Sequence, residues 1–227
     1  MLRLIFLLSL LAAPAFGADS PFVPSPLYPT VGSRAARGAL VWLPGAYGSD
    51  QAGPPPPPDI VDRLARPGFD VFQFLRPRGH DPLVGGGETL ARGLTALRAR
   101  GYRRIVVAGH SRGAWIALTA MAHPGLADAI IAISVGAHGT SRERQVQARK
   151  DWQALWAAAN APGTRVVLVQ LRDDPYDPDP RWRWDIAHKA RVDLRSIFLP
   201  PEPLGHVGVY LPAFDDRLGA EIAALAE

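Results

Sequence analysis

The chain has 227 residues, of which 48% are hydrophobic and 20% are charged, and its formal net charge is +4. This length and balance are typical of one globular domain with a core large enough to be stable alone. The basic residues are nearly all arginines and are scattered along the chain, so no basic stripe indicates nucleic-acid binding. Cysteine is absent, which excludes disulfides, a thiol nucleophile and a lipid-modified cysteine.

The N-terminus has the pattern of a secretory signal peptide. Arg3 supplies a positive charge, residues 4–13 are apolar, and Ala15 and Gly17 provide the small side chains that a cleavage site requires. The apolar run is well short of the roughly 20 residues that span a bilayer, so an uncleaved membrane anchor is the less favoured alternative. We therefore expect residues 1–17 to be removed. The mature protein would be periplasmic or secreted, with no stable membrane anchor.

The first part of the mature chain is rich in turn-forming residues. Residues 18–37 contain repeated prolines and serines, which predict an extended lead-in without a regular element. The first buried strand is expected over residues 39–43, and a glycine-containing loop follows over residues 44–48. The five prolines at 54–58 predict a stiff spacer into a helix that begins at Asp59. A docking ligand for a partner is the less favoured interpretation of these prolines.

A second strand is expected over residues 69–75, with an Arg-Gly loop over residues 76–81 at its exit. Three consecutive glycines, 85–87, then precede a predicted helix over residues 88–100. They follow no strand and precede no Lys-Ser/Thr pair, so they do not match a phosphate-binding loop. We interpret them as a flexible hinge.

An apolar, β-branched run over residues 105–108 leads to one serine between two glycines. The run predicts a strand buried on both faces, and the helical pattern of residues 114–121 begins almost directly after it. Ser111 therefore lies on a very tight bend. Such a bend forces strained backbone geometry and needs small residues two positions away on either side. Gly109 and Gly113 meet this requirement.

This Gly-His-Ser-Arg-Gly sequence, placed between a predicted strand and a predicted helix, resembles the nucleophile elbow of the α/β-hydrolase family. The resemblance covers roughly residues 38–226. It implies an α/β fold, a three-layer α/β/α sandwich with a mostly parallel, twisted sheet of about six strands. The family's N-terminal antiparallel strands would be reduced or missing. The active site would lie at the carboxyl edge of the sheet, within a single domain over residues 38–227.

The helix expected over residues 142–159 carries Trp152 and Trp156 on one face. Tryptophans at this spacing favour a core contact, and a short lid over an acyl chain is the alternative. In α/β-hydrolases an insertion at this point often covers the active site. The resemblance thus implies a short helical cap over about residues 140–160.

The resemblance also implies a triad acid after the second strand beyond the elbow. The strand predicted over residues 166–171 is followed by an acidic, proline-rich loop, and a helix is expected over residues 180–192. Within the loop, Asp174 and Pro178 fit the family's spacing. Asp177 is the alternative acid.

The general base of this family lies in a loop between the last strand and the terminal helix. These two elements are expected over residues 194–199 and 212–226, and His206 lies between them. It completes the order Ser, Asp, His along the chain. His80 is the reserve candidate.

The resemblance assigns a role to each of these residues. Ser111 would attack an acyl carbonyl, His206 would accept its proton, and Asp174 would hold the imidazole in the correct tautomer. The backbone N–H groups of Ala46 and Arg112 would bind the oxyanion, although the loop before Ala46 could be a simple turn. No metal-ligand spacing is present, and we expect no metal and no cofactor.

The expected function is that of a serine hydrolase that cleaves a small carboxylic ester or thioester through an acyl-enzyme. A peptidase or acyltransferase on the same three residues is one alternative. A catalytically silent binding protein that keeps the fold is another.

Overall fold

The computed structural model describes residues 20–46, 55–66, 68–76 and 83–227. The predicted signal peptide and the reserve base His80 lie outside these described residues. The described elements, in chain order, are β1 (Phe22–Pro24), β2 (Gly38–Leu43), α1 (Asp59–Ala65), β3 (Phe69–Phe74), α2 (Leu83–Ala99), β4 (Ile105–His110), α3 (Arg112–Thr119), η1 (Ala120–Ala122), β5 (Ala129–Ile133), α4 (Arg142–Ala157), β6 (Arg165–Gln170), α5 (Pro180–Ala187), β7 (Asp193–Phe198), η2 (Gly208–Tyr210), α6 (Pro212–Phe214), the π-helical η3 (Asp215–Gly219) and α7 (Ala220–Ala226).

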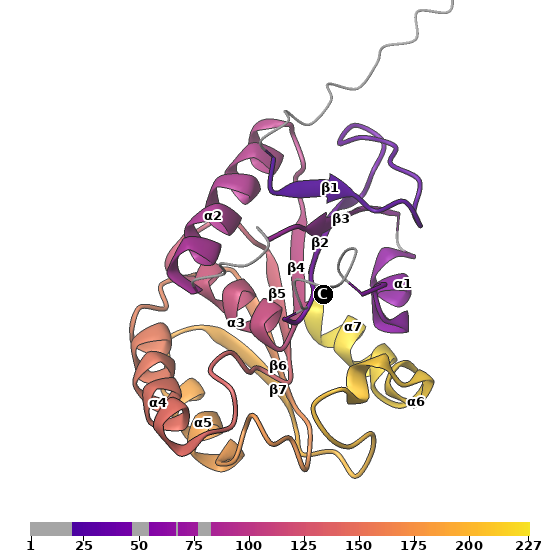
Figure 1. Ribbon diagram of the computed structural model, residues 1–227. Coiled ribbons are helices and arrows are strands. Elements are labelled where there is room, and N and C mark those ends of the chain that lie inside the picture. The colour runs from indigo at the N-terminus through magenta and orange to yellow at the C-terminus, as the bar shows by residue number, and fades with distance from the viewer. Residues whose placement is uncertain (1–19, 47–54, 67, 77–82) are drawn as a thin grey trace, which may run out of the picture.

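The described strands form one seven-stranded sheet in the order β1-β3-β2-β4-β5-β6-β7. Strand β1 is antiparallel to β3, and the other neighbours are all parallel. Helices α2, α3, α4 and α5 lie on one face of the sheet, and α1, α6 and α7 lie on the other (Figure 1). Each face has its own apolar cluster, which explains why β2, β4 and β5 are buried along their whole length. The predicted three-layer α/β/α sandwich is confirmed.

The lead-in contains one strand that the sequence analysis did not expect. Residues 22–24 pair with β3 in the register Phe22 to Phe74. Phe22 is fully buried and its ring contacts the Phe74 ring edge-on, with 5.9 Å between the ring centroids. Prolines exclude a central strand but are tolerated at a sheet edge, and β1 is an edge strand. The expectation of a lead-in without a regular element is therefore wrong over these residues.

The three glycines 85–87 belong to helix α2 and do not form a hinge. A Cβ atom on Gly86 would lie 2.8 Å from Cδ1 of Ile116, and one on Gly87 would lie 2.8 Å from Oγ1 of Thr119. Both partners belong to α3. The glycines therefore allow two helices to pack closely, which is a requirement of tertiary structure that the local pattern could not reveal.

Helix α4 is part of the layer beside the sheet. Trp152 and Trp156 are buried, and Trp152 packs edge-on against Trp115 with 5.6 Å between the ring centroids. The indole N–H of Trp152 donates to the carbonyl of Arg183. The two tryptophans thus make the core contact that their spacing favours.

The parallel strands end at one edge of the sheet. In the register, Leu43 pairs with Gly109, and Gly109 pairs with Ala132. At the neighbouring strands, Ile133 pairs with Val169. The loops that follow β2, β4, β5, β6 and β7 therefore leave the sheet on the same side, and residues distant in sequence meet there.

None of the described helices combines the length and the apolar character that crossing a membrane requires.

Candidate active site

Ser111 lies at the sharp turn between β4 and α3. Its backbone has φ 56° and ψ −120°, a conformation that residues other than glycine rarely adopt. The turn is held by its own backbone, since the Ser111 N–H donates to Ile133 and its carbonyl accepts from the Trp115 N–H. A side chain on Gly113 would overlap the carbonyl of Leu43, and one on Gly109 would lie 2.7 Å from the Gly113 carbonyl group. The tight bend expected from the sequence is thus present.

The structure brings His206 onto this serine. The Nε2 atom of His206 lies 2.7 Å from Oγ of Ser111, and Nδ1 lies 2.9 Å from each carboxylate oxygen of Asp174. Because Nδ1 faces a carboxylate, that nitrogen carries the proton and donates it. The unprotonated Nε2 then accepts from the Ser111 hydroxyl. The three residues come from three loops at the carboxyl edge of the sheet.

The two candidate acids have separate environments. Asp174 has a side chain that is 1% exposed, and its Oδ1 also accepts from the Tyr176 N–H at 2.8 Å. Asp177 instead accepts from Nε2 of Gln170 at 2.9 Å and forms a buried ion pair with Arg183 at 3.3 Å. Burial raises the pKa of Asp177 above its ordinary value. Of the two, only Asp174 contacts the imidazole of His206.

His110 contacts His206 in a way that the sequence analysis missed. Its Nε2 donates to the backbone carbonyl of His206 at 2.8 Å, and its ring lies edge-on to Tyr210 with 5.3 Å between the centroids. Burial lowers the pKa of His110 to about 4, so the ring is neutral and retains one N–H donor. His110 is adjacent to Ser111 in sequence, and the sequence predicted no role for it. In the structure His110 supports the loop that carries His206.

Tyr176 is a second residue that the sequence analysis did not identify. Its ring covers the imidazole of His206, with 4.2 Å between the ring centroids and 35° between the planes. A side chain on Gly136 would meet Cβ of Tyr176 at 2.8 Å and Cε1 of His206 at 3.1 Å. The imidazole is therefore enclosed between Tyr176 and the backbone of Gly136, which limits its rotation. Aromatic residues in acidic loops carry no sequence signal for such a contact.

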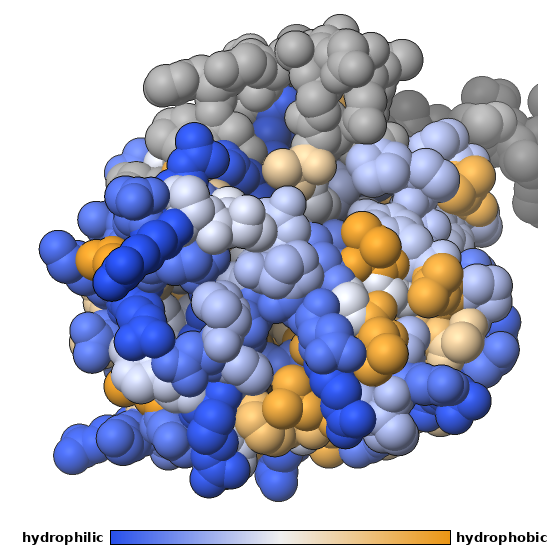
Figure 2. Space-filling view, turned by 60° about the horizontal axis from the view of Figure 1, so that its bottom comes forward, coloured by the Kyte–Doolittle hydropathy of each residue, from blue (hydrophilic) through white to orange (hydrophobic). Residues whose placement is uncertain are grey.

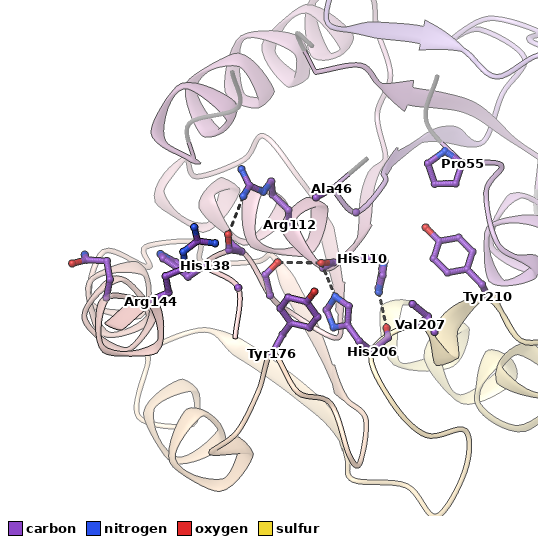
Figure 3. Close-up of a pocket in the computed structure, with 16 residues that line it drawn as sticks. Ala46, Pro55, His110, Arg112, His138, Arg144, Tyr176, His206, Val207 and Tyr210 are labelled. Atoms are coloured by element: carbon purple, nitrogen blue, oxygen red, sulfur yellow. Dashed lines mark hydrogen bonds between the residues drawn. The ribbon is translucent and has the colours of Figure 1, made fainter. Parts of the chain in front are cut away.

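A pocket of about 810 Å³ opens over Ser111 and His206. Ala46 and Arg112, whose N–H groups were expected to bind an oxyanion, both line it, as do His110 and Tyr176 (Figure 3). A volume of this size is typical of small-molecule sites.

The other polar clusters of the described residues are separate from the hydrogen-bonded group of Ser111, His206 and Asp174. His138 lines the pocket, and its Nε2 lies 2.6 Å from Oδ2 of Asp151. His188 lies against the ring of Trp184 instead, with 3.6 Å between the ring centroids. Among the described residues, no group of three or more His, Asp or Glu side chains could hold a metal ion.

No protein-family model matches the chain, and no curated protein matches its sequence. Solved structures resemble it instead. The Pyrococcus furiosus esterase Pf2001 superposes with a TM-score of 0.61 at 13% identity, over 85% of this chain and 81% of that one. CarC, a serine hydrolase involved in carbazole degradation, has a TM-score of 0.56 at 14% identity, over 84% and 93% of the two chains.

A third similar structure is brefeldin A esterase, a bacterial homologue of human hormone-sensitive lipase. It superposes with a TM-score of 0.56 at 16% identity, over 85% of this chain and 69% of that one. At these identities the similarity demonstrates a shared fold. The chain therefore has an α/β-hydrolase fold, and its chemistry has to be argued from the site.

Proposed function

We propose that this protein is a serine hydrolase that cleaves a carboxylic ester or thioester, with Ser111 as nucleophile, His206 as general base and Asp174 as the acid that orients it. One observation carries the proposal: a continuous hydrogen-bond chain from Ser111 through both ring nitrogens of His206 to Asp174, with distances of 2.7 Å and 2.9 Å. The serine, whose geometry suits the nucleophile elbow, and the histidine both line one pocket. The similar structures named as esterases and serine hydrolases add support.

In the first step, Oγ of Ser111 attacks the acyl carbon while Nε2 of His206 takes the hydroxyl proton. The hydroxyl has two acceptors nearby, Nε2 at 2.7 Å and the Gly136 carbonyl at 3.1 Å. The shorter contact favours proton transfer to His206. The carboxylate of Asp174 then stabilises the imidazolium that forms.

The tetrahedral intermediate places a negative charge on the former carbonyl oxygen. We assign the N–H groups of Ala46 and Arg112 as the donors that hold this oxyanion. The imidazolium returns its proton to the leaving alcohol or thiol, which leaves an acyl-serine. Water then attacks the acyl carbon and gives its proton to His206, and Ser111 is regenerated.

Two alternative functions remain. A peptidase or acyltransferase would use the same residues with an amide or an acceptor alcohol in place of the ester or water. A catalytically silent binding protein would not need the hydroxyl of Ser111 to contact the imidazole of His206. The 2.7 Å contact therefore favours an enzyme over a binding protein.

A fluorophosphonate probe tests the nucleophile. We expect it to label the wild type and the Ser134→Ala control, because Ser134 is a buried serine directly after the neighbouring strand β5 and does not line the pocket. Labelling should be lost in Ser111→Ala and strongly reduced in His206→Ala. Equal labelling of Ser111→Ala would refute the assignment. A panel of esters, thioesters, amides and acceptor alcohols then separates the hydrolase from its alternatives.

We also propose that the protein acts outside the cytoplasm after loss of residues 1–17, on a small-molecule ester and without a nucleic-acid partner or a membrane anchor. The pattern of charged, apolar and small residues at the N-terminus supports this location.

A further inference from the structure

The pocket over Ser111 has two chemically different ends. On one side of the Ser111–His206 pair lie Arg112, His138 and Arg144, and on the other lie Val207 and Tyr210 (Figure 3). A ligand whose reacting bond lies at Ser111 therefore reaches toward polar, basic groups in one direction and toward apolar groups in the other.

The first end carries positive charge. Arg144, in the first turn of α4, is exposed and forms no ion pair with any described residue. Arg112 also lines this end, and its Nη2 donates to the carbonyl of Ala137 at 3.0 Å. Among the described residues that line the pocket, none is an aspartate or a glutamate. Guanidinium groups bind carboxylate and phosphate oxygens in a planar, two-pronged geometry.

The nearby carboxylate of Asp151 contacts His138 and not Arg144. The Nε2 atom of His138 lies 2.6 Å from Oδ2 of Asp151, which does not itself line the pocket. The guanidinium of Arg144 pairs with no acid of the described residues and supplies positive charge at this end of the pocket. Gln147 adds an uncharged polar side chain to the same end.

The second end is apolar and continues onto the surface. Val207 is 63% exposed, and the nearby Leu204 and Leu211 are 45% and 49% exposed. These are large fractions for aliphatic side chains within one eight-residue segment. In Figure 2, hydrophobic residues gather on the side of η2 and α6, whereas the side of α4 is mainly hydrophilic. The apolar end of the pocket thus includes an exposed aliphatic side chain, that of Val207.

We propose that the substrate of this site is an amphiphilic ester. An anionic group of the carboxylate or phosphate kind binds Arg112 and Arg144, and an apolar group lies against Val207 and Tyr210, with the ester bond between them at Ser111. This inference rests on the proposed function for the position of the reacting bond. The charge of the bound group follows from the pocket wall alone.

Matched ester pairs that differ in charge test the proposal. For the acyl part, the p-nitrophenyl half-ester of glutaric acid is compared with p-nitrophenyl hexanoate. For the alcohol part, hexanoyl esters of p-hydroxybenzoate and of p-hydroxyphenyl phosphate are compared with that of p-hydroxybenzamide. In at least one pair we expect the anionic member to have about tenfold higher kcat/KM, as one charged hydrogen bond supplies. The preference should weaken with added salt.

Variants assign the preference to the pocket wall. Arg144→Gln and Arg112→Gln should each bring the ratio of kcat/KM within a pair toward one. Arg142→Gln is the matched control, since Arg142 is an exposed arginine of the same helix that does not line the pocket, and it should keep the wild-type ratio. Turnover of both members of every pair without a charge preference, or a preference that survives Arg144→Gln, overturns the inference and leaves the hydrolase proposal intact.

Binding separates a failure of this inference from a failure of the proposed function. The hexanoyl ester of p-hydroxybenzoate is titrated calorimetrically into Ser111→Ala and into the double variant Ser111→Ala with Arg144→Gln. Saturable binding that the second substitution weakens supports the anion site even where no ester is turned over. Absence of binding to both proteins, together with absence of charge preference, refutes it.

Discussion

The guanidinium of Arg76 donates to the backbone carbonyl of Gly45 at 2.5 Å and to that of Pro44 at 2.9 Å. Arg76 is buried and follows β3, whereas the two carbonyls follow β2. In a planar trans peptide the N–H points opposite to the C=O. Holding the Gly45 carbonyl thus orients the N–H of Ala46, one of the proposed oxyanion donors.

We therefore expect Arg76→Gln to lower kcat by about 10- to 100-fold, with a much smaller change in KM, since an oxyanion donor acts chiefly in the transition state. Arg66→Gln, which removes an exposed arginine paired with Asp62, serves as the control and should retain activity. Steady-state kinetics on folded protein check this. An unchanged kcat in folded Arg76→Gln would show that the loop does not depend on this side chain.

His110 should make stability depend on pH. Burial lowers its pKa to about 4 in the folded protein, against 6.5 for an ordinary histidine. Between these pH values the unfolded chain binds more protons at His110 than the folded protein does. The free energy of unfolding therefore rises as pH rises from 4 to 6.5, and above 6.5 His110 causes no further change. The full effect is on the order of 3 kcal/mol.

Urea unfolding across this pH range measures the effect. His110→Gln keeps an N–H donor for the His206 carbonyl and has no titrating ring, so its stability should rise less steeply with pH than that of the wild type. Identical slopes in the two proteins would show that His110 is not the group responsible.

Asp174 and Asp177 both lie in the loop after β6, but replacing Asp174 should lower activity whereas replacing Asp177 should lower stability. Asp174→Asn leaves His206 without the carboxylate that selects its tautomer, and kcat should fall by about 10⁴-fold with little change in stability. The circular dichroism spectrum and the unfolding midpoint provide the stability measurement. A fall of only a few-fold would assign the acid to another residue.

Asp177→Asn should have the opposite effect. It removes one partner of the buried pair with Arg183, which typically costs about 3–5 kcal/mol because a buried charge is left without its counterion. The folded fraction should keep a kcat close to that of the wild type. Unfolding by denaturant, combined with rates at low temperature, distinguishes the two outcomes.

Gly87 should resist replacement even though it lies inside a helix. An alanine gains about 1 kcal/mol in helix propensity, but its Cβ would lie 2.8 Å from Oγ1 and 3.1 Å from Cβ of Thr119. We expect Gly87→Ala to destabilise the protein by about 1–2 kcal/mol net. The double variant with Thr119→Ala should recover most of this loss, because the clashing atom is removed. If both single and double variants are more stable than the wild type, the helices do not pack as closely as described.

The N-terminal residues should be removed on export. When the full chain is expressed with an export pathway, mass spectrometry of the mature protein should find Ala18 as the first residue. Ala15→Asp places a charge where the peptidase requires a small side chain and should leave the chain unprocessed. A wild-type product that still begins at Met1 in the exported fraction would contradict the signal-peptide assignment.

Local patterns in the sequence were sufficient for the layers of the fold and for the bend at Ser111. An apolar run between turn residues predicts a buried strand wherever it occurs, as in β4, because the requirement lies within the segment itself. The glycines on either side of Ser111 belong to the same short segment. Among the described strands, the edge strand β1 was missed, since its pairing partner β3 lies about fifty residues further along the chain.

The residues of the candidate site also fall into those that the sequence identified and those that only the structure could distinguish. The motif around Ser111 selected the serine, the chain order that the resemblance implies selected His206, and the same order favoured Asp174 with Asp177 as the alternative. The two acids are three residues apart in one loop, and their roles differ because one side chain faces His206 and the other faces Arg183. That direction depends on the packing of β7 and the following loop beside β6.

The sequence by itself determined most of the strands and helices and the position of the strained serine, but not strand β1 or the first turns of α2. Tertiary structure alone decided which carboxylate meets the imidazole, that His110 holds the backbone of His206, and that the pocket has a basic and an apolar end. The physical reason is the separation along the chain over which each effect acts. Backbone preferences and hydrophobic periodicity act within a few neighbouring residues. Hydrogen bonds in the site join residues as much as 96 positions apart in the sequence.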